Sequence, residues 1–293
     1  GAADLRPAFA TERLRVSLCR GCGHAVASHA VLPQDGRDYH DQLEGGAFLD
    51  SLHATRQRQA KLILERLRRL EPGATRLLDL GCGRGWFVEA ALAGDFRDVA
   101  GADTSAIAVE SARRAGAHGV LLEPSDVLAQ LSRLPFRPEV VTLLDVLEHF
   151  EGESAIERLA AIVEVFKPEL RLVAIKVPVS SGVLYRSARA LHALGARGAL
   201  EQLYQVGTSP PHHHYFTAAS LKVVLRSAGL EVVEELSDLD FEPSSLVERA
   251  RAARHLPRPM VTMAGRAAAT AARFLGWQDA LVVFGRPLEP GLA

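Results

Sequence analysis

The stretch RLLDLGCGRGWFVEA, residues 76–90, places three glycines and a carboxylate between an apolar run and a segment with helical patterning. This order predicts a strand, a tight loop and a helix. Glycines allow positive φ and a close approach of the backbone to a ligand, and the first turn of the helix offers free N–H groups. We therefore expect a nucleotide or nucleoside beside Gly81, Gly83 and Gly85, with a plain tight turn as the alternative.

Two carboxylates narrow the kind of ligand. Asp103 ends the next expected strand, roughly 20 residues further on, where a carboxylate can accept hydrogen bonds from both hydroxyls of a ribose. Trp86 occupies the position where a dinucleotide-binding loop needs its third glycine, which argues against a nicotinamide cofactor. Asp79 lies two residues before the first glycine and suits a cationic ligand better than a diphosphate. The loop therefore predicts a cationic nucleoside.

The pattern around this loop predicts an α/β fold. Short apolar runs without polar alternation are separated by helical patterns, which indicates a parallel sheet covered by helices on both faces. We expect strands at 76–81, 98–103, 119–124, 139–146, 170–179, 230–241 and 279–287, and helices near 53–70, 86–93, 105–116, 125–132, 152–166 and 217–230.

The pattern also suggests a division of the chain. Residues 1–52 form an N-terminal extension that contains a Cys-x-x-Cys pair, and residues 53–293 form the main domain. Within that domain, the long insertion at 180–216 is expected to be a lid over the substrate, because insertions of this length in compact domains usually serve binding. Residues 242–278 are expected to form a C-terminal helical segment.

The composition limits the class of protein. The chain has 293 residues, 48% of them apolar, and a formal net charge of -1. This charge gives no overall field that would attract nucleic acid or an anionic membrane, so any such binding would have to be local. Three cysteines cannot form a disulfide framework, and the sequence has no signal-like or membrane-spanning apolar run. We expect a cytoplasmic location, no nucleic-acid or membrane partner, and either a monomer or a homodimer.

Four motifs in order resemble one family. LLDLGCGRG (77–85), VAGADTS (99–105), VVTLLDVLEHF (140–150) and VFKPELRLVAIKVPV (165–179) are similar to the class I S-adenosylmethionine-dependent methyltransferases, especially ubiquinone-pathway-type and natural-product O-methyltransferases with a DVLEH motif. The resemblance covers roughly residues 60–240. It implies a Rossmann-like, seven-stranded, mostly parallel sheet whose last strand, DALVVFGRP (279–287), is antiparallel. It also implies S-adenosylmethionine as cofactor and S-adenosylhomocysteine as product.

The resemblance further implies where the cofactor is bound. The glycine loop lines the methionine and ribose portion, the carboxylate after the second strand grips the ribose, and Asp126 faces the adenine, with Glu123 as a rival. An N-terminal aromatic covers the pocket in some relatives, although a surface turn is an equal alternative for Tyr39. The expected cofactor contacts are Tyr39, Asp79, Gly81, Cys82, Gly83, Gly85, Asp103, Thr104, Asp126, Val127 and Asp145.

Histidines are the candidates for a catalytic base. His149 lies just beyond the fourth strand, at the carboxyl edge where open α/β sheets bind ligands, and a satisfied packing residue is the alternative. In PPHHHYFT (210–217), His212, His213 and His214 form a second cluster, and His212 matches a histidine that faces the acceptor in relatives. The alternative for this cluster is a helix entry with Thr217 as N-cap. We take His149 as the first candidate and His212 and His214 as the others.

Two further groups could hold a metal ion. Asp145, Glu148 and His149 are spaced so that two carboxylates and an imidazole could bind a divalent cation, as in some relatives that have Glu in place of Asp145. Many relatives with this motif use no metal, so a divalent metal is not our first expectation. In CRGCGHA (19–25), Cys19, Cys22 and His24 offer part of a tetrahedral zinc site, which residues such as His29 or His40 would have to complete. The segment resembles the second half of a small zinc ribbon, whose first half is absent here, so an intact zinc site is not our first expectation either.

The leading functional hypothesis is methylation of a small-molecule hydroxyl, on a sugar, a phenol or a polyketide-like compound, in bacterial specialised or cell-envelope metabolism. A histidine-rich site suits a hydroxyl that must lose its proton as it is alkylated. The alternatives are methylation of carbon or nitrogen, metal-assisted RNA 2′-O-methylation, and a non-catalytic cofactor-binding protein. The sequence does not identify the acceptor.

Overall fold

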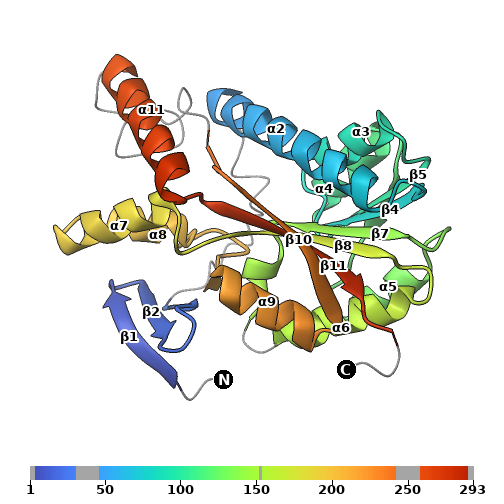
Figure 1. Ribbon diagram of the computed structural model, residues 1–293, viewed down its shortest axis with the longest axis horizontal. Coiled ribbons are helices and arrows are strands. Elements are labelled where there is room, and N and C mark those ends of the chain that lie inside the picture. The colour runs from blue at the N-terminus through green and yellow to red at the C-terminus, as the bar shows by residue number, and fades with distance from the viewer. Residues whose placement is uncertain (1–3, 31–45, 152–153, 242–257, 290–293) are drawn as a thin grey trace. The chain divides into compact units, whose positions relative to one another are not determined.

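The computed structural model describes residues 4–30, 46–151, 154–241 and 258–289 (Figure 1). The chain divides into two compact units. Unit 1 comprises Gly1–Thr55, Val177–Ser220 and Ser237–Leu281, and unit 2 comprises Arg56–Lys176, Leu221–Leu236 and Val282–Ala293.

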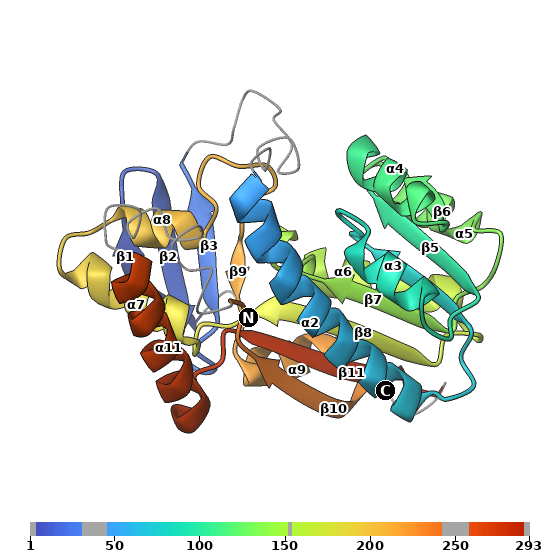
Figure 2. The same ribbon diagram turned by 90° about the horizontal axis from the view of Figure 1, so that it is seen from above.

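The large sheet carries the motifs of the glycine loop. Its strand order is β10-β11-β8-β7-β4-β5-β6, and β4 pairs in parallel with β5 and β7, β5 with β6, and β7 with β8. One antiparallel hairpin interrupts the parallel order, as expected for the last strand (Figure 2). The strands are β4 (Arg76–Leu80), β5 (Asp98–Asp103), β6 (His118–Leu121), β7 (Val140–Leu144), β8 (Leu172–Pro178), β10 (Leu230–Asp238) and β11 (Ala280–Pro287).

Helices cover both faces of this sheet. Figure 1 shows α2, α3 and α4 on one face and α5, α6 and α9 on the other. Burial on both faces explains why the central strands are continuously apolar, and β8 is buried along its length up to Val177. The helices are α2 (Gly46–Leu70), α3 (Trp86–Leu92), α4 (Ala106–Arg114), α5 (Val127–Ser132), α6 (Ser154–Phe166) and α9 (Ala218–Ser227). The fold class predicted from the sequence is therefore confirmed.

Unit 1 contains a second, smaller sheet. Its order is β1-β2-β3-β9, with β1 (Leu5–Ala10), β2 (Leu14–Cys19), β3 (Ala25–His29) and β9 (His214–Tyr215) all antiparallel to their neighbours. Helices α7 (Val183–Ala193) and α8 (Gly198–Leu203) supply the rest of its core. There the hydroxyl groups of Tyr185 and Tyr204 lie 3.0 Å apart, and both rings contact Tyr215.

This division differs from the one suggested by the sequence, with its boundary at residue 52. The N-terminal strands and the 180–216 insertion share one core, because Val26 of β3 pairs with His214 of β9. Such a pairing joins segments almost 190 residues apart in the sequence, and no local pattern reveals it.

The expected C-terminal helix is present as α11 (Arg258–Leu275), whose Ala269 and Ala272 pack against Leu239 and Phe241. Residues 242–257 of that segment lie outside the described residues. None of the helices in the described residues combines the length and the hydrophobicity that a membrane span requires.

Candidate active site

The loop between β4 and α3 has the backbone conformation that requires glycine. Gly81, Gly83 and Gly85 have φ values of 78, 50 and 75°. A Cβ atom on Gly81 would lie 2.3 Å from Cγ2 of Val146, so this glycine also allows the loop to approach the turn after β7. Residues other than glycine rarely adopt this conformation.

Asp79 lies at the end of β4 and is fully buried. Its Oδ1 accepts a hydrogen bond of 2.6 Å from the Thr142 hydroxyl, and 2% of the residue is exposed. Burial raises the pKa of the Asp79 carboxyl to about 7, the Thr142 hydrogen bond opposes this rise, and the nearby Asp103 adds to it. A bound cation would favour the charged form of such a group.

Asp103 is held by the backbone of two loops. Its Oδ2 accepts from the Gly83 N–H at 3.0 Å, and its Oδ1 accepts from the Ser105 N–H at 2.9 Å. Each oxygen thus keeps a lone pair for a further donor, as two ribose hydroxyls would require. A loop with positive φ at three glycines, a carboxylate with two remaining acceptors and a buried acid suited to a cation fit an adenosyl sulfonium compound.

Most of the remaining residues that the sequence suggested as cofactor contacts lie in and around the glycine loop and in the turns after β5 and before α5. Cys82 is buried under the loop, with Sγ 4.0 Å from the Ala108 carbonyl oxygen, and burial raises the pKa of this thiol. Thr104 is exposed beside Asp103, and Val127 begins α5. Asp126 and Glu123 are both exposed in the turn before α5, so either carboxylate remains a candidate for the adenine contact. Tyr39 lies outside the described residues.

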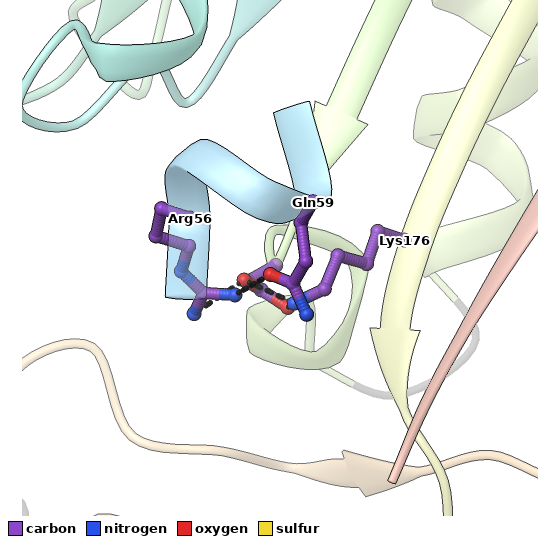
Figure 3. A network of polar contacts seen from close by, with 4 residues as sticks. Arg56, Gln59 and Lys176 are labelled. Atoms are coloured by element: carbon purple, nitrogen blue, oxygen red, sulfur yellow. Dashed lines mark hydrogen bonds and ion pairs between the residues drawn. The ribbon is translucent and has the colours of Figure 1, made fainter. Parts of the chain in front are cut away.

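Asp145 takes part in a network that the sequence did not predict. Figure 3 shows Arg56 and Gln59 of α2 and Lys176 of β8 directed toward one another. Lys176 Nζ lies 2.6 Å from Oδ1 and 2.8 Å from Oδ2 of Asp145, and Arg56 Nη2 lies 2.7 Å from Oδ2. Arg56 also donates to Oε1 of Gln59 at 2.8 Å. The signal that could have revealed this network is the single lysine inside the apolar run LRLVAIKVPV, since a buried lysine needs a partner.

The turn after β7 carries the first candidate base. Residues Leu147–His149 form a short 3₁₀ helix (η2), and the His149 N–H donates to the Val146 carbonyl at 3.0 Å. Glu148 is fully buried, and burial together with the neighbouring Asp145 raises the pKa of its carboxyl well above the usual range. His149 is half-buried. This turn thus carries an ion-paired carboxylate at Asp145, a buried carboxyl group at Glu148 and a half-buried imidazole at His149.

The other candidate histidines belong to unit 1. His214 is buried and stacks on His24, and its Nδ1 lies 3.1 Å from Nε2 of His24. The other ring nitrogen of His24 lies 3.2 Å from the Ser220 hydroxyl. Burial, and then His214, lower the pKa of His24 to about 3. The main-chain oxygen of His212 lies 2.9 Å from Nε2 of His29.

Two further hypotheses for unit 1 concern Thr217 as a helix cap and Cys19 with Cys22 as part of a zinc site. Thr217 caps α9, because its hydroxyl accepts from the Ser220 N–H at 3.1 Å, and it also donates to the Cys22 carbonyl at 2.9 Å. Cys19 and Cys22 are half-buried free thiols. Because the ring nitrogens of His24 face His214 and Ser220, this histidine is not directed to complete a site with the two cysteines.

Comparisons with known proteins agree with this geometry. Residues 52–235, more than half of the chain, match a methyltransferase-domain family. No curated protein matches the sequence. The cyclopropane synthase MmaA2 from Mycobacterium tuberculosis has a TM-score of 0.55 and 16% identity over 86% of this chain and 99% of that one. The cyclase SpnF has a TM-score of 0.50 and 18% identity over 80% of this chain and 81% of that one.

A third solved structure is the 1,6-didemethyltoxoflavin-N1-methyltransferase of Burkholderia thailandensis, with its acceptor and S-adenosylhomocysteine bound. It has a TM-score of 0.47 and 17% identity over 97% of this chain and 100% of that one. At such identities a likeness establishes the fold, and the acceptor has to be argued from the site. On the family match, the sheet order and the glycine loop together, the chain belongs to the class I methyltransferases that use S-adenosylmethionine as cofactor.

Proposed function

We propose that this methyltransferase methylates the oxygen of a small-molecule hydroxyl, with His149 as the general base. The observation that carries this proposal is the composition of the turn after β7. Its two carboxyl groups are an ion-paired Asp145 and a buried Glu148, whereas the half-buried His149 has the side chain suited to remove a hydroxyl proton. A sugar, a phenol or a polyketide-like compound of bacterial metabolism is the proposed acceptor class, and the cytoplasm is the proposed location.

The cofactor supplies an electrophilic methyl group when it is bound. We propose that Asp79 faces its cationic portion, that Asp103 accepts the ribose hydroxyls, and that the backbone of the glycine loop lies against both. We propose that Thr104, Val127 and one carboxylate of the turn before α5 lie beside the adenine ring of the cofactor. Fixing the acceptor and excluding water can together lower the barrier by about 7–11 kcal/mol at best, and the proton transfer to His149 adds to this.

The ion pairs of Asp145 also bear on metal dependence. Both carboxylate oxygens already accept from cationic side chains, so ligation of a divalent ion would require these pairs to open. We therefore propose that the reaction needs no added divalent ion. Turnover that is unchanged after treatment with a chelator would agree with this, and activity restored only by a divalent salt would contradict it.

The first experiment is a screen of candidate hydroxyl acceptors by mass spectrometry, followed by kinetics of His149→Ala. We expect the variant to lose roughly 100 to 10,000-fold in kcat, the range typical of a general base. Its affinity for S-adenosylhomocysteine, measured by calorimetry, should stay within a factor of three, because the loss concerns the proton and not the cofactor.

The matched control is His118→Ala, which removes an exposed histidine of β6 in the same unit. This variant should keep wild-type turnover. If His149→Ala retains activity toward the hydroxyl acceptor found in the screen, His149 is excluded as the base. If no hydroxyl compound is methylated and a carbon or nitrogen compound is, oxygen methylation is excluded.

A further inference from the structure

Helix α11 in unit 1 has two apolar faces. One face is buried and contains Val261, Ala269 and Ala272. Ala269 and Ala272 pack against Leu239 and Phe241. The other face is exposed, with 61% of Met260, 71% of Met263 and 90% of Phe274 accessible to solvent. A helix that packs on a protein core normally presents polar side chains on its outer face, so this pattern indicates an unfilled interaction surface.

The exposed residues form one continuous stripe. Positions three, four and seven residues apart lie on the same side of a helix, so Met260, Met263, Ala267 and Phe274 face one direction. Two further exposed alanines fill the spaces between them. The stripe consists of Met260, Met263, Ala264, Ala267, Ala271 and Phe274, and it contains no polar residue.

Positive charge borders this stripe. Arg266 and Arg273 are exposed on one flank of it, and the α11 sequence RPMVTMAGRAAATAARFL contains no Asp or Glu. The neighbouring α7, VLYRSARALHA, also lacks acidic residues, and Leu194 just after it is 84% exposed. The chain as a whole has a net charge of -1, so this part of unit 1 is a local concentration of basic charge.

The apolar stripe and its bordering arginines distinguish between two candidate partners of this surface, a second copy of the chain and an anionic lipid membrane. A second copy of the chain would bring the same arginines to the same flank, and like charges there oppose pairing. A stable protein interface also needs about 20–30 residues on each side, far more than the stripe supplies. An anionic lipid surface, in contrast, accepts apolar side chains at the acyl boundary and attracts arginine at the headgroups.

We propose that α11 is a peripheral docking surface for anionic membranes, with Met260, Met263 and Phe274 entering the interface and Arg266 and Arg273 contacting lipid headgroups. Such a helix lies in the plane of the interface and does not span the bilayer. The expectation of no membrane partner rested on the net charge of the whole chain, and that average does not report a local surface of this kind.

The test is co-sedimentation of the full chain with vesicles of phosphatidylcholine alone and with vesicles containing about one-third phosphatidylglycerol. We expect binding to the anionic vesicles only, weakened by added salt. Arg266→Gln/Arg273→Gln should lower the partition coefficient roughly 30-fold, since each basic side chain near an anionic surface contributes a factor of about five. Met263→Gln/Phe274→Gln should lower it by at least about tenfold through the lost apolar insertion.

Matched controls remove the same kinds of exposed side chain from unit 2. Arg113→Gln/Arg114→Gln on α4 and Val223→Gln on α9 should bind vesicles as the wild type does. Circular dichroism and binding of S-adenosylhomocysteine show that each variant is folded. The proposal is overturned if wild-type protein ignores anionic vesicles, binds neutral ones equally, or binds equally well with the α11 substitutions. It is also overturned if light scattering shows a dimer that the same α11 substitutions dissociate.

Discussion

Lys176 of β8 and Asp145, the residue after β7, join two neighbouring strands through both side chain and backbone. The Lys176 ammonium lies 2.6 and 2.8 Å from the two oxygens of Asp145, and the Asp145 N–H donates to the Lys176 carbonyl at 2.9 Å. Asp145 has a φ of 60°, an uncommon backbone conformation for a residue other than glycine. These contacts fix the start of the turn that carries His149, so Lys176 is a positioning residue for the proposed base.

Removal of the lysine charge should destabilise the protein strongly. Lys176→Met keeps the apolar stem of a side chain that is only 2% exposed. Loss of one partner of a buried ion pair costs about 3–5 kcal/mol, and because Arg56 still pairs with Asp145 we expect a loss near 3 kcal/mol in unfolding free energy. Urea unfolding measures this loss. Turnover should fall as well, while the affinity for S-adenosylhomocysteine stays within a factor of three.

Lys222→Met is the control for this prediction. Lys222 Nζ lies 2.6 Å from Glu235 Oε1, but both side chains are about one-third exposed, and such pairs contribute less than about 1 kcal/mol. Equal losses in the two variants would refute the role assigned to burial. In addition, Asp145→Asn and Lys176→Met should be less damaging together than the sum of the two single changes, since the double variant removes both charges of the buried pair and leaves only Arg56 without its carboxylate partner.

Cofactor affinity should increase as pH rises through 7. The pKa of Asp79 is about 7 because the group is buried, so its charged form, which attracts a cation, is the minor form at pH 6 and the major form at pH 8. If only the charged form binds, S-adenosylmethionine affinity rises about tenfold between these values. Asp79→Asn should bind more weakly at pH 8 and lose this dependence. Calorimetry at three pH values tests the prediction, with Asp95→Asn, an exposed acid, as control.

The raised pKa of Asp79 also predicts how the stability of the cofactor-free protein depends on pH. An acid whose folded-state pKa is raised binds more protons in the folded than in the unfolded state, so its contribution to stability falls as pH rises from about 4 to 7. The Asp79→Asn variant should therefore lose less stability than the wild type across this interval. Parallel unfolding curves for the two proteins at pH 5 and pH 7 would contradict the assignment.

Substitution of Gly81 should impair both folding and cofactor binding. Gly81→Ala combines a φ of 78° with a Cβ only 2.3 Å from the Val146 side chain. Gly229→Ala is a matched control, because Gly229 has the same φ of 78° and no atom within 4 Å of its added Cβ. The control should cost about 1–2 kcal/mol through backbone strain. Gly81→Ala should cost about 1–3 kcal/mol more through the steric clash. Similar losses in thermal unfolding would show that Val146 moves aside freely.

The imidazole pair of unit 1 should make this unit sensitive to acid. The pKa of His24 is lowered to about 3, chiefly by burial, so the folded state binds fewer protons than the unfolded state below about pH 6.5. Stability from this group is complete above that pH and is lost as pH falls toward 3, by about 2 kcal/mol between pH 7 and 5. In urea unfolding, His24→Gln should lose less stability between pH 7 and 5 than the wild type does. The control His118→Gln, which changes an exposed histidine, should lose as much as the wild type.

Local sequence patterns were sufficient to predict the large sheet and the conformation of the glycine loop. Apolar runs such as 139–146 and 170–179 indicate strands that are buried on both faces of the sheet. Gly81 and Gly85 indicate a positive-φ backbone conformation that other residues rarely adopt. These are local constraints, so a single chain segment is enough to reveal each of them. Asp79 and Asp103, which we propose to face the cofactor, could also be located from the sequence, because each lies at a characteristic distance in sequence from the same loop.

Contacts between segments far apart in the chain are visible only in the folded structure. It joined the N-terminal strands to β9 in one unit, paired His24 with His214, and brought Arg56 and Lys176 to Asp145. These contacts depend on strand pairing and on side-chain packing between residues that are far apart in the chain. Local periodicity does not encode such pairings, and the energy of a buried charge depends on the partner that folding brings to it.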